Sequence, residues 1–193
     1  MSDVTNPTAT TAERKLRSDA RRNRERILEA ARATFSAQGV DAQIDEIARR
    51  AGVGVGTVYR HFPTKEALLG ELVAQKFRRF TDHARAALEA DDAWEGFAGM
   101  LRANAELVAR DAALQNALMH TAAIRRHAGE ERRTLEGLVA RIVQRAQEAG
   151  ELRPDFTTDD IPMLMCGVSS TMGEHFDWRR HLELVLDGLR VRS

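Results

Sequence analysis

The chain has 193 residues, of which 43% are hydrophobic, 30% are charged and 5% are aromatic, and its formal net charge at pH 7 is zero. This length fits one small module joined to one mid-sized domain better than two large domains. No stretch reaches the ~18 to 20 apolar residues that a membrane span needs, and the first residues lack the apolar stretch of a signal peptide. We therefore expect a cytoplasmic protein without a membrane partner.

The zero net charge hides a difference between the two ends of the chain. Residues 11 to 65 contain 12 Lys and Arg against 7 Asp and Glu, whereas residues 66 to 193 contain 17 against 21. The net charges of these segments are therefore +5 and −4. A basic end suits a polyanionic partner, although a run of charges is more often only a solvated helix face.

Apolar residues at helical spacing predict an all-α fold, and strand-type alternation is almost absent from the chain. Residues 1–17 are rich in Thr, Ser and Ala without apolar periodicity, which predicts a disordered arm. From Ser18 the pattern predicts a helix that ends near Gly39, because glycine is a natural residue just after a helix C-terminus. Its apolar positions are Ile27, Leu28, Ala31 and Phe35, and its other face carries Arg21, Arg22, Arg24 and Arg32.

Two short helices joined by a tight turn come next. Gly52 ends the first, and Pro63 ends the second because proline cannot continue a helix. The first has apolar residues at i, i+3, i+4 and i+7, namely Ile44, Ile47, Ala48 and Ala51. The apolar positions of the second are Val55, Val58 and Phe62. Two short helices with a glycine-containing turn of three or four residues are typical of a helix-turn-helix.

Thr64 is a good N-cap for a further helix, and the rest of the chain predicts five more. These lie approximately at residues 93–110, 112–127, 130–149, 159–176 and 178–191. Pro162 fits the helix from residue 159 because it falls in the first turn, where its missing N–H does little harm. The expected fold is all-α with about nine helices. It comprises a three-helix helix-turn-helix domain at residues 18–65 and a larger helical domain at residues 66–193.

The glycines at positions 52, 54 and 56 raise the alternative of a cofactor loop. The dinucleotide-binding pattern G-x-G-x-x-G would need a third glycine at position 57 or 59, where the chain has Thr57 and Tyr59. A predicted helix precedes these glycines instead of a strand, and the Lys-Ser/Thr ending of a phosphate loop is absent. This spacing excludes the cofactor loop, and we expect no bound cofactor.

On a helical wheel with Val58 facing the core, the opposite face of the second short helix carries Gly56 and Arg60, flanked by Thr57 and Tyr59. An outward glycine lets the helix backbone approach another surface closely. A guanidinium beside it can reach guanine O6 and N7 in a major groove, and hydroxyl and phenol groups suit phosphate contacts. The alternative is an ordinary solvated helix of a bundle, but the short length, the glycines and the basic residues upstream favour DNA.

The segment from about Arg24 to Leu69 resembles the TetR family of bacterial transcriptional regulators. The matching elements are "RILEAARATFSAQGVDA", "IDEIARRAGVGVGTVYRHF" and "PTKEALL". A weaker match joins "EAGELRPDFTTDDI" and "WRRHLELVLDGLR" to the later helices of that family. The resemblance implies a homodimer in which each subunit presents one helix-turn-helix to a palindromic operator, usually to repress transcription.

The resemblance also implies roles for single residues. Positions matching Thr57, Tyr59, His61 and Lys65 commonly touch DNA, mostly its backbone, while Arg60 matches a variable position that sets specificity. The chain departs from the family pattern in two places. Gly54 stands where a capping Ser is common, and Gln43 with Ile44 stands where Thr or Ser often caps the second helix and contacts phosphate. Our candidate DNA contacts are Gly56, Thr57, Tyr59, Arg60, His61, Lys65, Gln43 and Arg22.

The last two predicted helices offer a candidate dimer interface. One carries the small residues Gly167, Ser170 and Gly173, which allow close helix packing. The other has a continuous apolar stripe: Leu182, Val185, Leu186 and Leu189. Two such helices per subunit predict an intersubunit four-helix bundle, which is the arrangement that the family uses. The alternative is that both helices belong only to the internal core.

A ligand cavity for an unknown small-molecule effector is expected in the second domain. Its candidate lining residues are Trp94, Phe97, Met100, Met119, His120 and Met163, although Met and aromatic residues at helical spacing are more often plain core. No three or four residues are identified as convergent metal ligands, so we expect no metal. The single cysteine, Cys166, lies in an apolar stretch and is expected to be a small buried side chain.

These observations favour a ligand-responsive DNA-binding repressor. The alternative is a nucleoid-type DNA-binding protein with little sequence preference, which would bind through the phosphate backbone alone. An enzyme is not expected, because the sequence shows no paired carboxylates with reaction geometry, no nucleophile motif and no phosphate loop.

Overall fold

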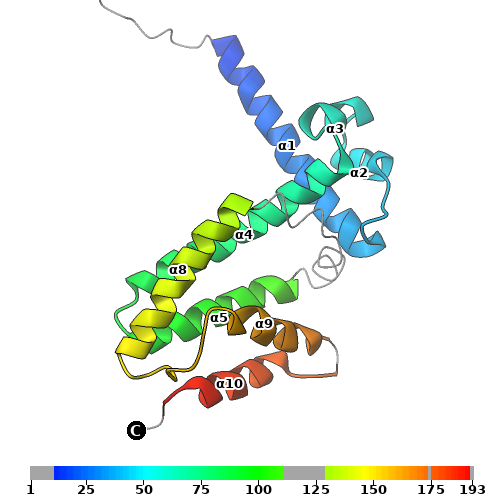
Figure 1. Cartoon of the computed structure of the whole chain (residues 1–193). Helices are drawn as coiled ribbons and strands as arrows, with labels where there is room; N and C mark the ends of the chain where they lie inside the picture. The colour runs from blue at the N-terminus through cyan, green and yellow to red at the C-terminus, as the bar shows by residue number, and fades with distance from the viewer. Residues whose placement is uncertain (1–10, 111–128, 174, 192–193) are drawn as a thin grey trace, which may run out of the picture. The chain divides into compact units, whose positions relative to one another are not determined.

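The computed structural model describes residues 11–110, 129–173 and 175–191. Over these ranges the chain forms eight α-helices, and its only β-type pairings there are isolated bridges, which confirms the all-α fold (Figure 1). The helices are α1 (Thr11–Gln38), α2 (Ile44–Ala51), α3 (Val55–His61), α4 (Lys65–Glu89), α5 (Ala93–Arg110), α8 (Gly129–Glu148), α9 (Asp160–Ser170) and α10 (Trp178–Leu189). The helix expected at residues 112–127 lies outside the described residues. Among the helices described, none is both long and apolar enough to cross a membrane.

The chain divides into two compact units, one ending at Leu68 and the other beginning at Leu69. The division falls within the first turn of α4, a few residues after the boundary between residues 65 and 66 that the sequence predicted. The first unit contains α1, α2, α3 and the start of α4, and the second contains the remaining helices.

The first unit has a small core between α2, α3 and the carboxyl-terminal half of α1. The left-handed backbone at Gly39, with φ 76°, and at Gly52, with φ 63°, ends α1 and α2 where the sequence predicted. Val55 is only half-buried. The other apolar positions predicted for these three helices are buried, which confirms their registers: Ile27, Leu28, Ala31, Phe35, Ile44, Ile47, Ala48, Ala51, Val58 and Phe62.

The start of α1 differs from the prediction. The chain is helical from Thr11, whereas a disordered arm was expected for residues 1–17 and a helix only from Ser18; the first ten residues of that arm lie outside the described residues. The expectation relied on apolar periodicity, which these residues lack. They are nevertheless good helix formers, and exposed ion pairs such as Arg21 with Glu25, at i,i+4 spacing, support the next turns. Intrinsic propensity therefore extends the helix where packing does not.

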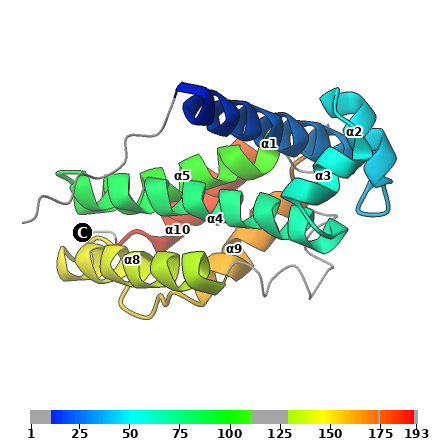
Figure 2. The same cartoon turned by 90° about the horizontal axis from the view of Figure 1, so that it is seen from above.

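The second unit is held by one core, to which α4, α5, α8, α9 and α10 all contribute buried residues. Figure 2 shows the course of these helices. Phe97 of α5 is fully buried there, with its ring centre 5.8 Å from that of Trp94 and 5.5 Å, edge to face, from that of Phe156. Aromatic pairs at these distances add to the stabilisation from burial. The predicted helices at residues 93–110, 130–149 and 178–191 are confirmed to within two residues at each end.

The connection from α4 to α5 is tightly packed. A Cβ at Gly96 would lie 2.5 Å from the carbonyl oxygen of Ala87, so only glycine fits there. Arg145 of α8 donates hydrogen bonds to the carbonyl oxygens of Leu88 and Ala90 at 3.2 and 2.5 Å. These carbonyls at the end of α4 have no partner within the helix, so the guanidinium satisfies them.

α9 ends at Ser170, earlier than the predicted end near residue 176. The hydroxyl groups of Ser169, Ser170 and Thr171 donate to the carbonyl oxygens three residues before them, at 2.7 to 2.9 Å. Side-chain hydrogen bonds of this kind compete with the helical backbone pattern. The apolar spacing alone predicts a longer helix, because these side-chain hydrogen bonds do not change the apolar period.

Candidate nucleic-acid interface

The turn between α2 and α3 is fixed by backbone hydrogen bonds and by α1. The N–H of Gly52 donates to the carbonyl oxygen of Arg49 at 3.2 Å, and that of Val53 donates to Ala48 at 3.1 Å. This pair of bonds around a left-handed residue is a Schellman motif, which satisfies the last carbonyls of α2. Arg26 of α1 donates from Nη2 to the carbonyl oxygen of Gly52 at 3.2 Å. The turn that sets the orientation of α3 is therefore hydrogen-bonded to α1.

α3 presents the face that the helical wheel predicted. Val58 is 1% exposed, whereas Gly56, Tyr59 and Arg60 are exposed and Thr57 is half-buried. Within the described part of the chain, no atom beyond its own helix backbone lies within 4 Å of the place where a Cβ at Gly56 would stand. The direction of this face is confirmed, and its contact with DNA stays a prediction.

His61 ends α3 in a partly buried position. Its Nε2 atom is buried and, in the described part of the chain, has no hydrogen-bond partner. Burial lowers the pKa of His61 below its ordinary value, and the positive charges of Arg60 and Arg24 lower this pKa further. This environment therefore favours the neutral imidazole over the charged one.

Lys65 lies at the start of α4, directly after the second short helix. Thr64 caps α4 as predicted, because its hydroxyl oxygen accepts a hydrogen bond from the N–H of Ala67 at 3.1 Å. The ammonium nitrogen of Lys65 lies 6.0 Å from the centre of the Phe35 ring. This places the Lys65 side chain across the core residue of α1, with its charge on the surface of the first unit.

Gln43 and Arg22 lie outside α3. Gln43 precedes α2 and is exposed, and its amide nitrogen donates to the carbonyl oxygen of Asp41 at 3.1 Å instead of capping the helix. Arg22 is exposed on α1 and forms an ion pair with Asp19. The structure thus groups Gly56, Thr57, Tyr59, Arg60 and His61 on one short helix and leaves Gln43 and Arg22 on separate elements.

Two arginines that were not among the candidate DNA contacts support the turn and the end of α3. Arg26 holds the turn through Gly52, and the guanidinium carbon of Arg24 lies 5.2 Å from the centre of the Phe62 ring, just after α3. Arg24 was expected on the face opposite the apolar residues, and this was wrong, because Arg24 precedes Ile27 by three residues and Ala31 by seven and so lies on their side of α1. Both arginines lie shortly before Ile27, where burial in α1 begins. The contacts themselves depend on how α2 and α3 pack, which the sequence pattern does not specify.

Comparison with known proteins identifies both units. Residues 27–72 match the family model of bacterial regulatory proteins of the tetR family. Residues 89–191, which are more than half of the chain, match the model of the C-terminal domain of SbtR-like transcriptional regulators. The chain belongs to the TetR family. The two matches together cover most of the described helices, so the assignment does not depend on any single residue.

Two solved structures extend the likeness over nearly the whole chain. A TetR transcription regulatory protein from Mycobacterium vanbaalenii is 38% identical, and the match covers 91% of this chain and 99% of that one with a TM-score of 0.67. The TetR regulator SCO0520 from Streptomyces coelicolor is 31% identical over 88% of this chain and 99% of that one, with a TM-score of 0.64.

Similarity to curated proteins is confined to a shorter segment. The HTH-type regulators TtgW and SrpR of Pseudomonas putida are each 47% identical over 64 residues, which are 33% of this chain. The chain spans 48% of the length of TtgW and 30% of the length of SrpR. The similarity to these relatives covers one third of this TetR-family chain, so it does not show which genes this chain regulates.

The residues expected to line an effector cavity separate into three groups. Trp94, Phe97 and Met100 are 3%, 0% and 2% exposed and lie together in the core of the second unit. Met163 of α9 is 68% exposed and lies apart from them. Met119 and His120 lie outside the described residues. Their role in binding an effector stays a prediction.

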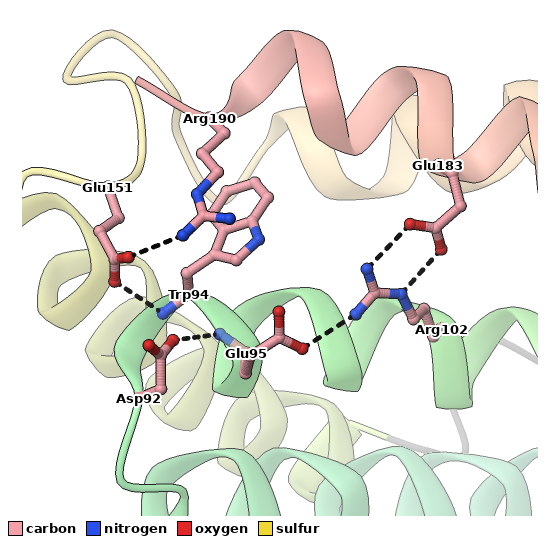
Figure 3. A network of polar contacts seen from close by, with 7 residues as sticks. All are labelled: Asp92, Trp94, Glu95, Arg102, Glu151, Glu183 and Arg190. Carbon is pink, nitrogen blue, oxygen red and sulfur yellow. Dashed lines mark hydrogen bonds and ion pairs between the residues drawn. The ribbon is translucent and has the colours of Figure 1, made fainter. Parts of the chain in front are cut away.

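A polar network ties α5 to α10 and to the segment after α8 (Figure 3). Arg102 donates from Nε and Nη2 to the carboxylate of Glu183 at 2.7 and 2.8 Å. This paired hydrogen bond lowers the pKa of Glu183 and raises that of Arg102. At the other end of α5, Glu151 accepts hydrogen bonds from the N–H of Trp94 and from Arg190, both at 3.1 Å. The network therefore connects α10 and the residue that follows it to both ends of α5.

The expected dimer stripe on α10 needs a correction. Leu182 and Leu186 are 2% and 1% exposed within one chain, so they have almost no surface left for a second chain. Val185 and Leu189 are half-buried. An apolar stripe shows which side of a helix is covered, but it does not distinguish cover by the same chain from cover by a partner.

The exposed sides of α9 and α10 carry apolar and small residues. On α9 these occur at i, i+3, i+4 and i+7: Met163, Cys166, Gly167 and Ser170. Cys166 is thus exposed, and its expected burial was wrong, because α9 turns Val168 inward instead. On α10 the exposed apolar or small positions are Leu184, Gly188 and, just after the helix, Val191.

Proposed function

We propose that this TetR-family chain is a sequence-specific DNA-binding repressor, which binds a palindromic operator as a homodimer and releases it when a small-molecule effector binds. The observation that carries the proposal is Gly56 at the centre of the outward face of α3. Alanine is a better helix former than glycine by roughly 1 kcal/mol, and no atom in the described part of the chain excludes its methyl group. Glycine therefore costs helix stability without serving the fold, which suits a surface that another molecule approaches closely.

The residues around Gly56 support contact with a major groove. Arg60 lies on the same exposed face and can donate two hydrogen bonds to a guanine edge. Thr57, Tyr59 and Lys65 surround it with donors that suit phosphate oxygens, which position a protein on DNA without reading sequence. The net charge of +5 over residues 11–65 supports the same partner.

Dimerisation is proposed through the exposed sides of α9 and α10. Among the described residues, no atom comes within 4 Å of the Cβ positions of Gly167 and Gly188, which permits close approach of a second helix pair. Met163 and Leu184 are 68% and 52% exposed, and they give the exposed sides of α9 and α10 an apolar surface that a partner can cover. A two-fold axis there would present two copies of α3 to two half-sites.

Effector binding is proposed in the second unit. A ligand that binds one arrangement of the dimer better than another shifts the population toward that arrangement. If the favoured arrangement separates the two copies of α3 by a distance that no longer fits the operator, the affinity for DNA falls. The effector is unidentified, and Trp94, Phe97, Met100, Met119, His120 and Met163 remain its candidate contacts.

The proposal is tested by selecting duplexes from a random-sequence library with the full-length protein. We expect enrichment of an inverted repeat whose half-sites lie about one helical turn apart, bound at least about 1,000-fold more tightly than its scrambled version at physiological salt. Equal affinity for both duplexes would instead identify a nucleoid-type protein of low specificity. Absence of binding to any duplex would contradict both functions.

A further inference from the structure

The amino-terminal half of α1 is a helix without a core. No residue from Arg14 to Arg26 is buried, whereas burial in α1 begins at Ile27. Figures 1 and 2 both show α2 and α3 against the carboxyl-terminal half of α1, with the amino-terminal half extending past them. This half therefore contributes little to the packing of the first unit.

Basic residues cover one side of this exposed half. Arg14, Arg17, Arg21 and Arg24 follow one another at i, i+3, i+7 and i+10, which places them within roughly 80° on a helical wheel. We call these four residues the basic row. Arg24 lies over the ring of Phe62, 5.2 Å from its centre, at the end of α3. The basic row thus starts beside the proposed DNA-reading helix and runs away from it along α1.

The basic row is long enough to follow a nucleic-acid backbone. Ten residues separate Arg14 from Arg24, which corresponds to about 15 Å of helix. Successive phosphates of one DNA strand are about 3.4 Å apart along the axis, so the row passes about four of them. Arg21 has only an exposed ion pair with Glu25 at 3.7 Å, and among the described residues neither Arg14 nor Arg17 has an ion-pair partner.

The composition of this half distinguishes DNA from a membrane surface. A helix that lies on a membrane needs a broad apolar face opposite its basic residues. Between Arg14 and Arg26 the only large apolar side chain is Leu16, which is 72% exposed. Seven basic residues against two acidic ones, without an apolar face, fit a polyanion with regularly spaced charges.

We propose that the basic row is a second DNA-contacting element, which binds the phosphates that flank each half-site and lengthens the footprint beyond α3. This inference rests on the proposed function, because it needs α3 to dock on DNA. Phosphate contacts carry no sequence information, so the basic row adds affinity and salt dependence without changing which operator is preferred.

The test compares two triple variants of the full-length protein on the duplex that the wild type enriches. The first variant is R14Q/R17Q/R21Q, and the matched control is R79Q/R133Q/R141Q, which removes three exposed arginines from the second unit. Glutamine is a good helix former, so α1 keeps its helicity, and circular dichroism verifies this. Affinity is measured between 50 and 200 mM salt for long duplexes and for duplexes trimmed to the inverted repeat.

We expect the first variant to lose at least about tenfold in affinity at low salt. Its slope of log affinity against log salt should be less steep by about 5, since a dimer loses six contacts at about 0.9 each. The control should behave as the wild type, and the preference for the enriched over the scrambled duplex should not change. Trimming the flanks should weaken the wild type but not the variant.

Two results overturn the inference in different ways. If the wild type binds its enriched duplex and R14Q/R17Q/R21Q binds it with the same affinity and salt slope, the basic row does not contact DNA. The proposed function is then unaffected. If the wild type binds no duplex, both the proposed function and this inference are contradicted.

Discussion

Arg26 of α1 donates a hydrogen bond to the carbonyl oxygen of Gly52, 26 residues further along the chain, and so attaches α1 to the turn that aims α3. The two residues are also sterically coupled. A Cβ at Gly52 would lie 2.6 Å from Nη2 of Arg26, and the φ of 63° at Gly52 is in the left-handed region. The direction of the proposed reading helix therefore depends on a contact between two elements that are distant in sequence.

Gly52→Ala should destabilise the first unit for two reasons. Left-handed backbone costs alanine roughly 1 kcal/mol relative to glycine, and the new methyl group displaces Arg26. Gly39→Ala is the matched control, because Gly39 has φ 76° and open space around its Cβ position. Urea unfolding should show a larger loss for Gly52→Ala than for Gly39→Ala, and the difference should vanish in an Arg26→Ala background. Equal losses in both backgrounds would refute the coupling.

Replacing Arg60 and replacing Lys65 should weaken DNA binding in different ways. Arg60→Ala should cost about 1 to 3 kcal/mol of binding and relax the preference at one base pair, because its guanidinium reads a base edge. Lys65→Ala should weaken binding to every duplex alike and reduce the salt slope by about one per contact, because its charge meets a phosphate. Quantitative binding to single-substitution duplexes separates the two patterns. If both variants lost the same affinity on every duplex, Arg60 would not contact a base edge.

His61 should make the stability of the folded chain depend on pH. Its pKa in the folded chain is lowered, chiefly by burial, below the value of about 6.5 expected in the unfolded chain. Below that value the unfolded chain binds a proton that the folded chain resists. The stability is therefore complete above about pH 6.5 and falls as the pH drops toward the folded pKa.

The measurement is urea unfolding of the wild type and of His61→Gln at pH 7.5 and 5.5. The wild type should lose more stability than the variant between these two pH values, because glutamine does not titrate. Parallel losses in both proteins would show that His61 does not carry the dependence. The other five histidines serve as a common background, since both proteins retain them.

Gly167→Arg should block dimerisation if α9 lies at the interface. The new side chain would enter the open space beside the exposed face of α9 and hold a second chain away. Gly137→Arg on α8 is the matched control, because it also replaces an exposed helical glycine with open space around it. Sedimentation should show monomers for the first variant and dimers for the second. Dimers of Gly167→Arg with unchanged affinity would place the interface elsewhere.

Local pattern predicted the registers of the short helices. Ile47, Val58 and Phe62 are buried where the spacing placed them, and Gly52 and Thr64 end and begin helices as expected. The outward direction of Gly56 followed from the same spacing. These features depend on periodicity and on capping chemistry, which are local properties of a sequence.

Features that depend on distant contacts could not be predicted in this way. The stripe with Leu182 and Leu186 was correctly identified as apolar, but only the structure shows that both residues lie in the internal core of the same chain. The contact of Arg26 with Gly52 likewise needs the packing of α1 on α2. The early start of α1 was missed because helix propensity, unlike burial, leaves no apolar period.

The affinity of Gly56→Ala for the enriched duplex tests the central claim most directly. The methyl group meets nothing in the described fold, so the variant should be at least as stable as the wild type, as should the control Gly137→Ala on α8. If the backbone of α3 approaches DNA at Gly56, the variant should bind the duplex at least about tenfold more weakly, a loss of about 1.4 kcal/mol, while the control binds normally. A stable Gly56→Ala protein with the affinity of the wild type would contradict the account.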